Sequence, residues 1–217
     1  MTRASVVQTT ENLMDQPRTA QGAELITAST RLSVVRFADS IPESWANGAG
    51  VTRVLAAGSL PGSPADFDWR LSIASVISGP FSALPGVDRI LTLAKGPTLS
   101  LTVDGHQHEV APCRPLTFRG ESVTVCQTTG PASALNVMTR RAVCSATVTV
   151  RIGSGVVAAP LGCLTYLVAL AGTVSVRFRD GHTTGLQMFD AVRQATAATV
   201  SAANGGRFAV IRIRQRH

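Results

Sequence analysis

Apolar and polar residues alternate along most of this chain, in short runs that begin near residue 32. Leu99, Leu101 and Val103, for example, alternate with polar residues and lead into Asp104-Gly105. A period of two residues is typical of a β-strand with one buried face. An Asp-Gly pair between two such runs favours a tight hairpin. The pattern therefore predicts an all-β protein.

Turn-forming residues divide the chain into many short segments. Pro42 to Gly50 predicts a loop or tight corner and Gly58 to Ala65 a surface loop, because proline, glycine and asparagine favour turns. Residues 1–30 show no sustained period and predict an irregular leader. No segment of ten or more residues has a helical period, and short strands with frequent turns indicate a sandwich or barrel. We expect strands at residues 32–37, 52–57, 67–77, 89–94, 99–103, 107–110, 116–118, 123–126, 134–138 and 146–150.

The second half of the chain repeats a feature of the first. Asp104-Gly105-His106 recurs as Asp180-Gly181-His182, and Gly96 recurs as Gly172, each with an offset of 76 residues. The apolar positions that follow Gly96 and those that follow Gly172 differ by one residue once the offset of 76 is subtracted. A β-bulge in one copy would explain this shift; otherwise the similarity is partly chance. We interpret the repeat as two tandem β units, divided near residues 140–150.

The composition is that of a folded protein. Of the 217 residues, 45% are hydrophobic and 15% are charged, which is unlike a disordered chain. No apolar run approaches the roughly 18–20 residues that cross a bilayer. Met1 to Thr10 lacks the apolar stretch of a secretory signal. We therefore expect a cytoplasmic protein without a membrane partner.

The net charge of +7 comes almost entirely from arginine, since Lys95 is the only lysine among 20 basic residues. Such an excess is compatible with nucleic-acid binding, but the arginines are spread along the whole chain. The densest cluster, Arg212, Arg214 and Arg216, alternates with other residues as on a half-exposed strand. We therefore expect a solvated, arginine-rich surface and no nucleic-acid partner.

Four short stretches carry a distinctive combination of residues: Trp45 to Arg53, Phe67 to Ala74, Leu84 to Leu91 and Leu135 to Arg141. In this order and at this spacing they resemble the HutD/Ves family, bacterial proteins associated with histidine utilisation that have a cupin-type double-barrel fold. The family usually has a second glycine at the position of Ala49. The resemblance implies a bicupin, two tandem jelly-roll-like β-barrels. Residues 31–142 would form the first, ligand-binding barrel and residues 143–217 the second, supporting one.

The cysteines and histidines do not form a convincing metal site. The four cysteines show no Cys-x-x-Cys spacing and are expected to be reduced. His106 and His108 resemble the His-x-His of a metal-binding cupin, but Glu109 follows directly and points to the opposite face of the strand. Ligands must converge on one point. A solvent-exposed turn explains these histidines better, so we predict no metal and no cofactor.

The stretch from residue 68 to 76 predicts a strand with two different faces. Period two places Asp68, Arg70 and Ser72 on one face and Trp69, Leu71 and Ile73 on the other. On the residues alone, Arg70 is either a surface arginine paired with a nearby aspartate or a lumen-facing one. The resemblance favours the lumen, which is the ligand site of cupin-like folds. The candidate ligand-binding residues are Asn47, Thr52, Arg70, Ser72, Asp88, Arg89 and Asn136.

Each candidate suggests a role. Arg70 presents a planar fork suited to a carboxylate, and the neutral side chains would orient the ligand. Asp88 and Arg89 form either a second charge pair at the pocket mouth or a local ion pair. The resemblance implies a small-molecule binding protein for a carboxylated or formylated amino-acid derivative from histidine catabolism, with a regulatory or sensing role. The alternative is a cupin-type hydrolase or isomerase acting on a small acid. A homodimer is left as an open alternative to a monomer.

Overall fold

The computed structural model describes residues 33–44 and 50–216, and within them the fold is all-β, as predicted. The only helical element in these ranges is a 3-10 turn, η1 (Phe37–Asp39). The predicted leader at residues 1–30 and the candidate Asn47 lie outside the described residues. No helix in the described ranges is long and apolar enough to cross a membrane. The strands are β1 (Ser33–Val35), β2 (Pro42–Ser44), β3 (Val51–Gly58), β4 (Trp69–Val76), β5 (Gly79–Pro80), β6 (Val87–Lys95), β7 (Leu99–Val103), β8 (His106–Val110), β9 (Pro115–Arg119), β10 (Thr124–Gln127), β11 (Ala132–Arg140), β12 (Cys144–Ile152), β13 (Gly155–Val157), β14 (Cys163–Arg177), β15 (Thr183–Leu186), β16 (Ala191–Gln194) and β17 (Ala198–Gln215).

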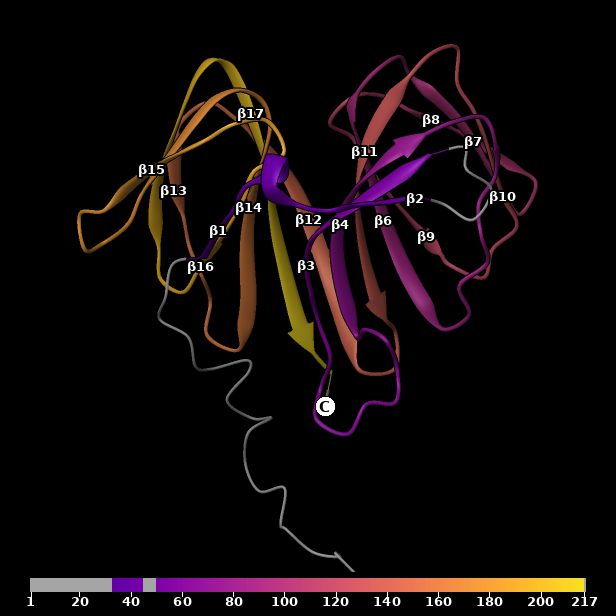
Figure 1. The fold of residues 1–217 in the computed structure, drawn as a ribbon, viewed down its shortest axis with the longest axis horizontal. Helices are drawn as coiled ribbons and strands as arrows, with labels where there is room; N and C mark the ends of the chain where they lie inside the picture. Colours follow the sequence, from indigo (N-terminus) through magenta and orange to yellow (C-terminus); the bar gives the residue numbers. More distant parts are fainter. Residues whose placement is uncertain (1–32, 45–49, 217) are drawn as a thin grey trace, which may run out of the picture.

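The strands form three antiparallel sheets in two lobes (Figure 1). The N-terminal lobe has a six-stranded sheet, β2-β3-β4-β11-β6-β9, and a four-stranded sheet, β5-β10-β7-β8. The C-terminal lobe has one seven-stranded sheet. Five of its strands follow the order β1-β16-β14-β17-β12, and the other two, β13 and β15, pair with β17 and β14. None of these sheets closes on itself within the described residues. β1 precedes the N-terminal lobe in sequence but pairs with β16, so it belongs to the C-terminal sheet.

Three apolar cores hold the lobes together. One fills the N-terminal lobe between its two sheets and includes Leu93 and Leu101. A second fills the C-terminal lobe. The third lies between the lobes, where Leu71 of β4 joins the same cluster as Tyr166 of β14, and the Trp69 and Tyr166 rings approach to 5.7 Å between centroids. The apolar face of β4 therefore packs against the C-terminal lobe, and its opposite face is turned into the N-terminal lobe.

The segment predicted as a loop from residue 42 begins with a short strand instead. β2 pairs with β3, with Glu43 opposite Thr52. Proline has no N–H to donate, and Pro42 is tolerated here because β2 is the edge of its sheet. The turn-forming residues of this segment predicted a loop. The strand forms because β2 pairs with β3 in the folded protein.

The two copies of the repeated turn are both hairpins, but they differ in detail. Asp104 and Gly105 form a two-residue turn between β7 and β8, with φ of 48° and 81°. In the second copy, Arg177 pairs with Thr183 and the turn spans residues 178–182. The register of β14 shifts on both sides of Ala171. These irregularities supply the bulge that the phase difference between the copies requires.

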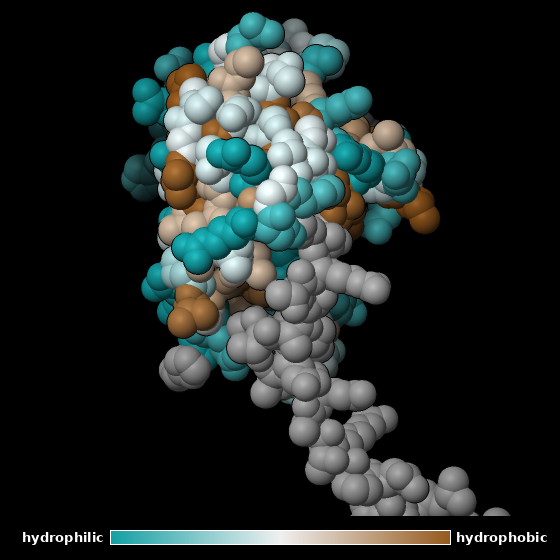
Figure 2. All heavy atoms as spheres, turned by 90° about the vertical axis from the view of Figure 1, so that its left-hand side faces the viewer, coloured by the Kyte–Doolittle hydropathy of each residue, from teal (hydrophilic) through white to brown (hydrophobic). Residues whose placement is uncertain are grey.

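The arginine-rich end of the chain is a half-exposed strand, as predicted. Ile211 and Ile213 of β17 are buried in the core between the lobes, whereas Arg214 is exposed and Arg212 is half-buried. Figure 2 shows the outer face of the C-terminal lobe, where apolar residues are scattered among polar ones. Isolated apolar residues of this kind are normal on a protein surface.

We expect Gly172→Ala to destabilise the protein by about 1–3 kcal/mol. Gly172 has φ of +66°, and an added Cβ would lie 2.7 Å from Cα of Gly206, so both the backbone and the neighbouring strand oppose it. Gly185→Ala is the matched control, because a Cβ there meets nothing within 4 Å. Urea unfolding would measure both. Equal free energies of unfolding for the two variants would contradict the steric role given to Gly172.

Candidate functional site

A cavity of about 530 Å³ opens at one end of the N-terminal lobe. It is lined by the inward face of β4, by β6 and β11 beside it, and by the segment from Ile77 to Ser82. Five of the seven predicted site residues lie on its wall. They are Thr52, Arg70, Ser72, Arg89 and Asn136.

Strand register explains why these side chains meet. Met138 of β11 lies opposite Arg70 of β4 on one side and opposite Arg89 of β6 on the other. Directly opposed residues in an antiparallel pair project to the same face, so the two arginines flank Met138 on the lumen side. Asn136, two residues earlier, lies opposite Ser72 and adds a polar row beneath the arginines. A basic row and a neutral row therefore face the cavity.

The two arginines are held by aromatic rings instead of carboxylates. The Arg70 guanidinium lies 4.6 Å from the Phe67 ring centroid. The Arg89 guanidinium lies 4.9 Å from the ring of Phe81 and 5.2 Å from that of Phe118. A guanidinium above a ring is fixed in place by cation–π attraction, but its charge is not neutralised.

Neither arginine of the cavity wall forms an ion pair within the described residues. Arg89 is 7% exposed. Burial, and secondly the charge of Arg70, lower the pKa of Arg89 to about 10. Burial also lowers the pKa of Arg70, against an opposing effect of Glu43. Both side chains stay protonated near pH 7, so the cavity attracts anions.

Three buried polar atoms in this wall have no hydrogen-bond partner among the described residues. They are Nε of Arg70, Nε of Arg89 and Oδ1 of Asn136. Arg70 does donate from a terminal nitrogen to Sδ of Met138 at 3.3 Å. Leaving a buried polar group unpaired costs about 1–3 kcal/mol. Two donors and one acceptor are thus available for a ligand with complementary groups.

The predicted candidate Asp88 lies outside the cavity wall. Asp88 precedes Arg89 on β6 and therefore points to the opposite face, where it pairs with Nε of Arg141 at 2.6 Å. Arg141 also pairs with Glu121 at 2.8 Å, so Asp88 belongs to an ion-pair network outside the cavity wall. Asp88 and Arg89 therefore do not pair with each other. Arg89 lies on the cavity wall, and Asp88 pairs with Arg141.

Among the wall residues that were absent from the predicted site, two bear on its chemistry, Met138 and Glu43. Met138 had a usable signal, because period two places it on the face of Asn136. Glu43 had none, since its segment was predicted as a loop. Both line the cavity.

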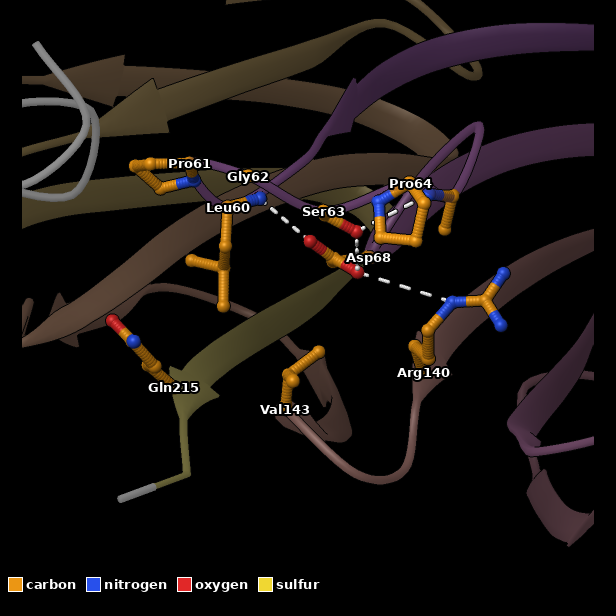
Figure 3. A pocket seen from close by; sticks show the side chains of 10 residues that line it. Leu60, Pro61, Gly62, Ser63, Pro64, Asp68, Arg140, Val143 and Gln215 are labelled. Carbon is orange, nitrogen blue, oxygen red and sulfur yellow. Dashed lines mark hydrogen bonds and ion pairs between the residues drawn. The ribbon is translucent and has the colours of Figure 1, made fainter. Parts of the chain in front are cut away.

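A larger depression of about 880 Å³ lies at the loop after β3 (Figure 3). Its charged residues are Asp68 and Arg140. Asp68 is fully buried and accepts hydrogen bonds from the Leu60 N–H at 2.6 Å and the Ser63 hydroxyl at 2.9 Å, with Nε of Arg140 at 3.9 Å. The carboxylate is thus occupied in holding the loop. The buried charge of this depression therefore has a structural explanation, whereas the arginines of the smaller cavity have no carboxylate paired with them in the described residues.

The histidines of the first repeated turn are not part of either cavity. His106 is exposed, and its Nδ1 lies 3.2 Å from the Asp104 carbonyl oxygen. In the described ranges, no three His, Cys, Asp or Glu side chains are grouped so that they could hold a metal ion.

This chain is similar to a known protein family, to a curated protein and to solved structures. The family model described as HutD matches residues 38–210. Protein Ves of Citrobacter koseri is 43% identical over 110 residues, which are 49% of this chain and 56% of Ves, so the match spans little more than half of that relative. A solved structure of HutD from Pseudomonas fluorescens is 28% identical, with a TM-score of 0.73 over 86% of this chain and all of that one. A cupin 2 conserved barrel domain protein from Leptotrichia buccalis is 12% identical, with a TM-score of 0.52 over 85% of this chain and 96% of that one. The last likeness shows a cupin-like fold.

Proposed function

The chain belongs to the HutD family, and on that premise we propose that it binds a small carboxylated or formylated amino-acid derivative in the cavity of its N-terminal lobe. The observation that carries the proposal is the pair of arginines that lie over aromatic rings. Within the described residues they form no ion pair, and their buried Nε atoms have no hydrogen-bond partner. HutD/Ves proteins are associated with histidine utilisation. We therefore place the ligand among the intermediates of histidine breakdown and give the protein a regulatory or sensing role.

The ligand carboxylate would lie between Arg70 and Arg89, above Met138. Each guanidinium offers its Nε and one terminal nitrogen, an arrangement that matches the two oxygens of a carboxylate. Because burial disfavours both arginine charges, an arriving anion relieves an existing cost as well as forming new hydrogen bonds. This supports a carboxylate over a neutral ligand.

The uncharged part of the ligand would lie against Ser72 and Asn136. The unpaired Oδ1 of Asn136 accepts, so it favours a ligand with an N–H or O–H donor beyond the carboxylate. An amide or a formylated amine supplies such a donor. The volume of about 530 Å³ lies within the range of small-molecule sites and suits an amino-acid derivative.

The two lobes would have different tasks. In the proposed bicupin arrangement, residues 31–142 and 143–217 each correspond to a jelly-roll-like barrel. The core between the lobes covers the outer face of β4, so the C-terminal lobe would keep Arg70 and Ser72 in position from behind. The second barrel thus supports the ligand-binding one.

We expect Arg70→Ala to weaken ligand binding by about 2–5 kcal/mol, because it removes one half of the carboxylate clamp. Calorimetric titration with formylglutamate, urocanate and histidine measures this. Arg114→Ala is the control, since Arg114 is exposed in the turn before β9 and outside the cavity wall. No binding of any of the three at millimolar concentration by the folded wild-type protein would refute the proposed function. Unchanged affinity in Arg70→Ala would remove Arg70 from the site.

A further inference from the structure

The edge strand β2 brings a carboxylate to the rim of the cavity. Glu43 lies opposite Thr52 in the β2–β3 pair, and Thr52 lies opposite Ala74 in the β3–β4 pair. Opposed residues share a face, so this row is on the same side of the sheet as Arg70 and Ser72. Glu43, Thr52 and Ala74 accordingly all line the cavity.

Glu43 is the only acidic residue among the described residues of the cavity wall. The other charged residues of the wall are Arg70 and Arg89, so the wall carries two positive charges and one negative charge. Glu43 makes no ion pair with either arginine in the described part of the chain. Its charge nevertheless acts on Arg70, whose pKa it raises against the effect of burial. The net charge available to a ligand is therefore +1.

We propose that Glu43 is a charge selector that makes the site prefer a carboxylate ligand with one negative charge over a ligand with two. This inference rests on the proposed function and specifies its ligand class. One carboxylate between the arginines brings the cavity to neutrality. A second carboxylate makes the occupied cavity negative and adds repulsion from Glu43 at the rim, and such like charges oppose binding.

A simpler role for Glu43 would be to protect the sheet edge. Charged residues on edge strands discourage pairing with other chains, and β2 is an exposed three-residue edge strand. The edge role makes no difference to ligand charge, whereas the selector role does. The two are separated by a pair of ligands that differ only in charge.

The test uses N-formylglutamine, with one negative charge, and N-formylglutamate, with two. Wild-type protein, Glu43→Gln and Glu109→Gln are titrated with both by calorimetry at low and high salt. Glu109 is exposed on β8 and lies outside the cavity wall, so its variant removes the same charge elsewhere. We expect the wild type to bind the monoanion more tightly. In Glu43→Gln the dianion should gain about tenfold relative to the monoanion at low salt, and less at high salt.

Each other outcome is a refutation. If both ligands bind but their affinity ratio is the same in wild type and Glu43→Gln, or if the wild type prefers the dianion, charge selection by Glu43 is wrong and the binding function stands. If Glu109→Gln shifts the ratio equally, the effect is of net charge and not of this residue. If neither ligand binds to any folded variant, the proposed function fails and the selector with it.

Discussion

Arg89→Met is expected to abolish carboxylate binding and, at the same time, to stabilise the folded protein. Arg89 is a buried cation that has no ion-pair partner among the described residues, and the pKa of about 10 reflects a cost of roughly 3 kcal/mol for its charged form. Methionine has a similar length and packs well against aromatic rings such as Phe81 and Phe118. After the loss of cation–π attraction, we expect a net gain of about 1–3 kcal/mol.

The binding loss should exceed about a hundredfold, because Arg89 is buried in the wall and supplies one half of the clamp. Urea unfolding measures the stability and calorimetry the affinity, with Arg114→Met as an exposed control that should change neither by more than about 0.5 kcal/mol. A variant that loses binding because it is less stable than wild type would contradict the assignment. Opposite signs for the two effects are the expected signature of a ligand site, where function is retained at the expense of stability.

Asp68→Ala is expected to have the largest effect on stability, a loss of about 3–5 kcal/mol. The Asp68 carboxylate is fully buried and accepts hydrogen bonds from the Leu60 N–H and the Ser63 hydroxyl, so its removal leaves these two donors without an acceptor and takes the ion-pair partner at 3.9 Å from Arg140. The loop between β3 and β4 would lose its anchor. Urea or thermal unfolding gives the magnitude.

Asp66→Ala is the matched control, since Asp66 lies two residues earlier in the same loop and is exposed. We expect a change within about 0.5 kcal/mol. The folded fraction of Asp68→Ala should bind the ligand as the wild type does, because Asp68 lines the other depression and not the ligand cavity. Stability close to wild type in Asp68→Ala, or a specific loss of ligand affinity, would transfer Asp68 from the structural role to a functional one.

The strands were predictable because their signals are local. Each of the ten expected segments overlaps a strand of the structure. The alternation from Trp69 to Ile73 also predicted which side chains of β4 turn toward the apolar core between the lobes. Asp68 was grouped with Arg70 by the same period, but β4 begins at Trp69, and Asp68 lies in another depression. The rule fails where the strand ends, because alternation depends on extended backbone geometry.

The candidate site was predictable only in part. The family motifs directed attention to Arg70, Ser72 and Asn136, which do share one wall. Period two would have separated Asp88 from Arg89, but the turn signal at Pro85-Gly86 made them look like one charge pair. Glu43 was missed, since Pro42 and the following glycines predicted a loop and the strand depends on pairing with β3.

By itself, the sequence determined the all-β class, the strand segments and the inward face of β4, because these follow from the spacing of apolar residues along the chain. Only the tertiary structure decided which charges meet. Arg70 and Arg89 are on β4 and β6, and they flank one cavity because β11, which follows both in the chain, is inserted between them. Pairing between distant strands, and the packing that sets these arginines against aromatic rings and not against carboxylates in the described part of the chain, are properties of the packed molecule and have no local signal.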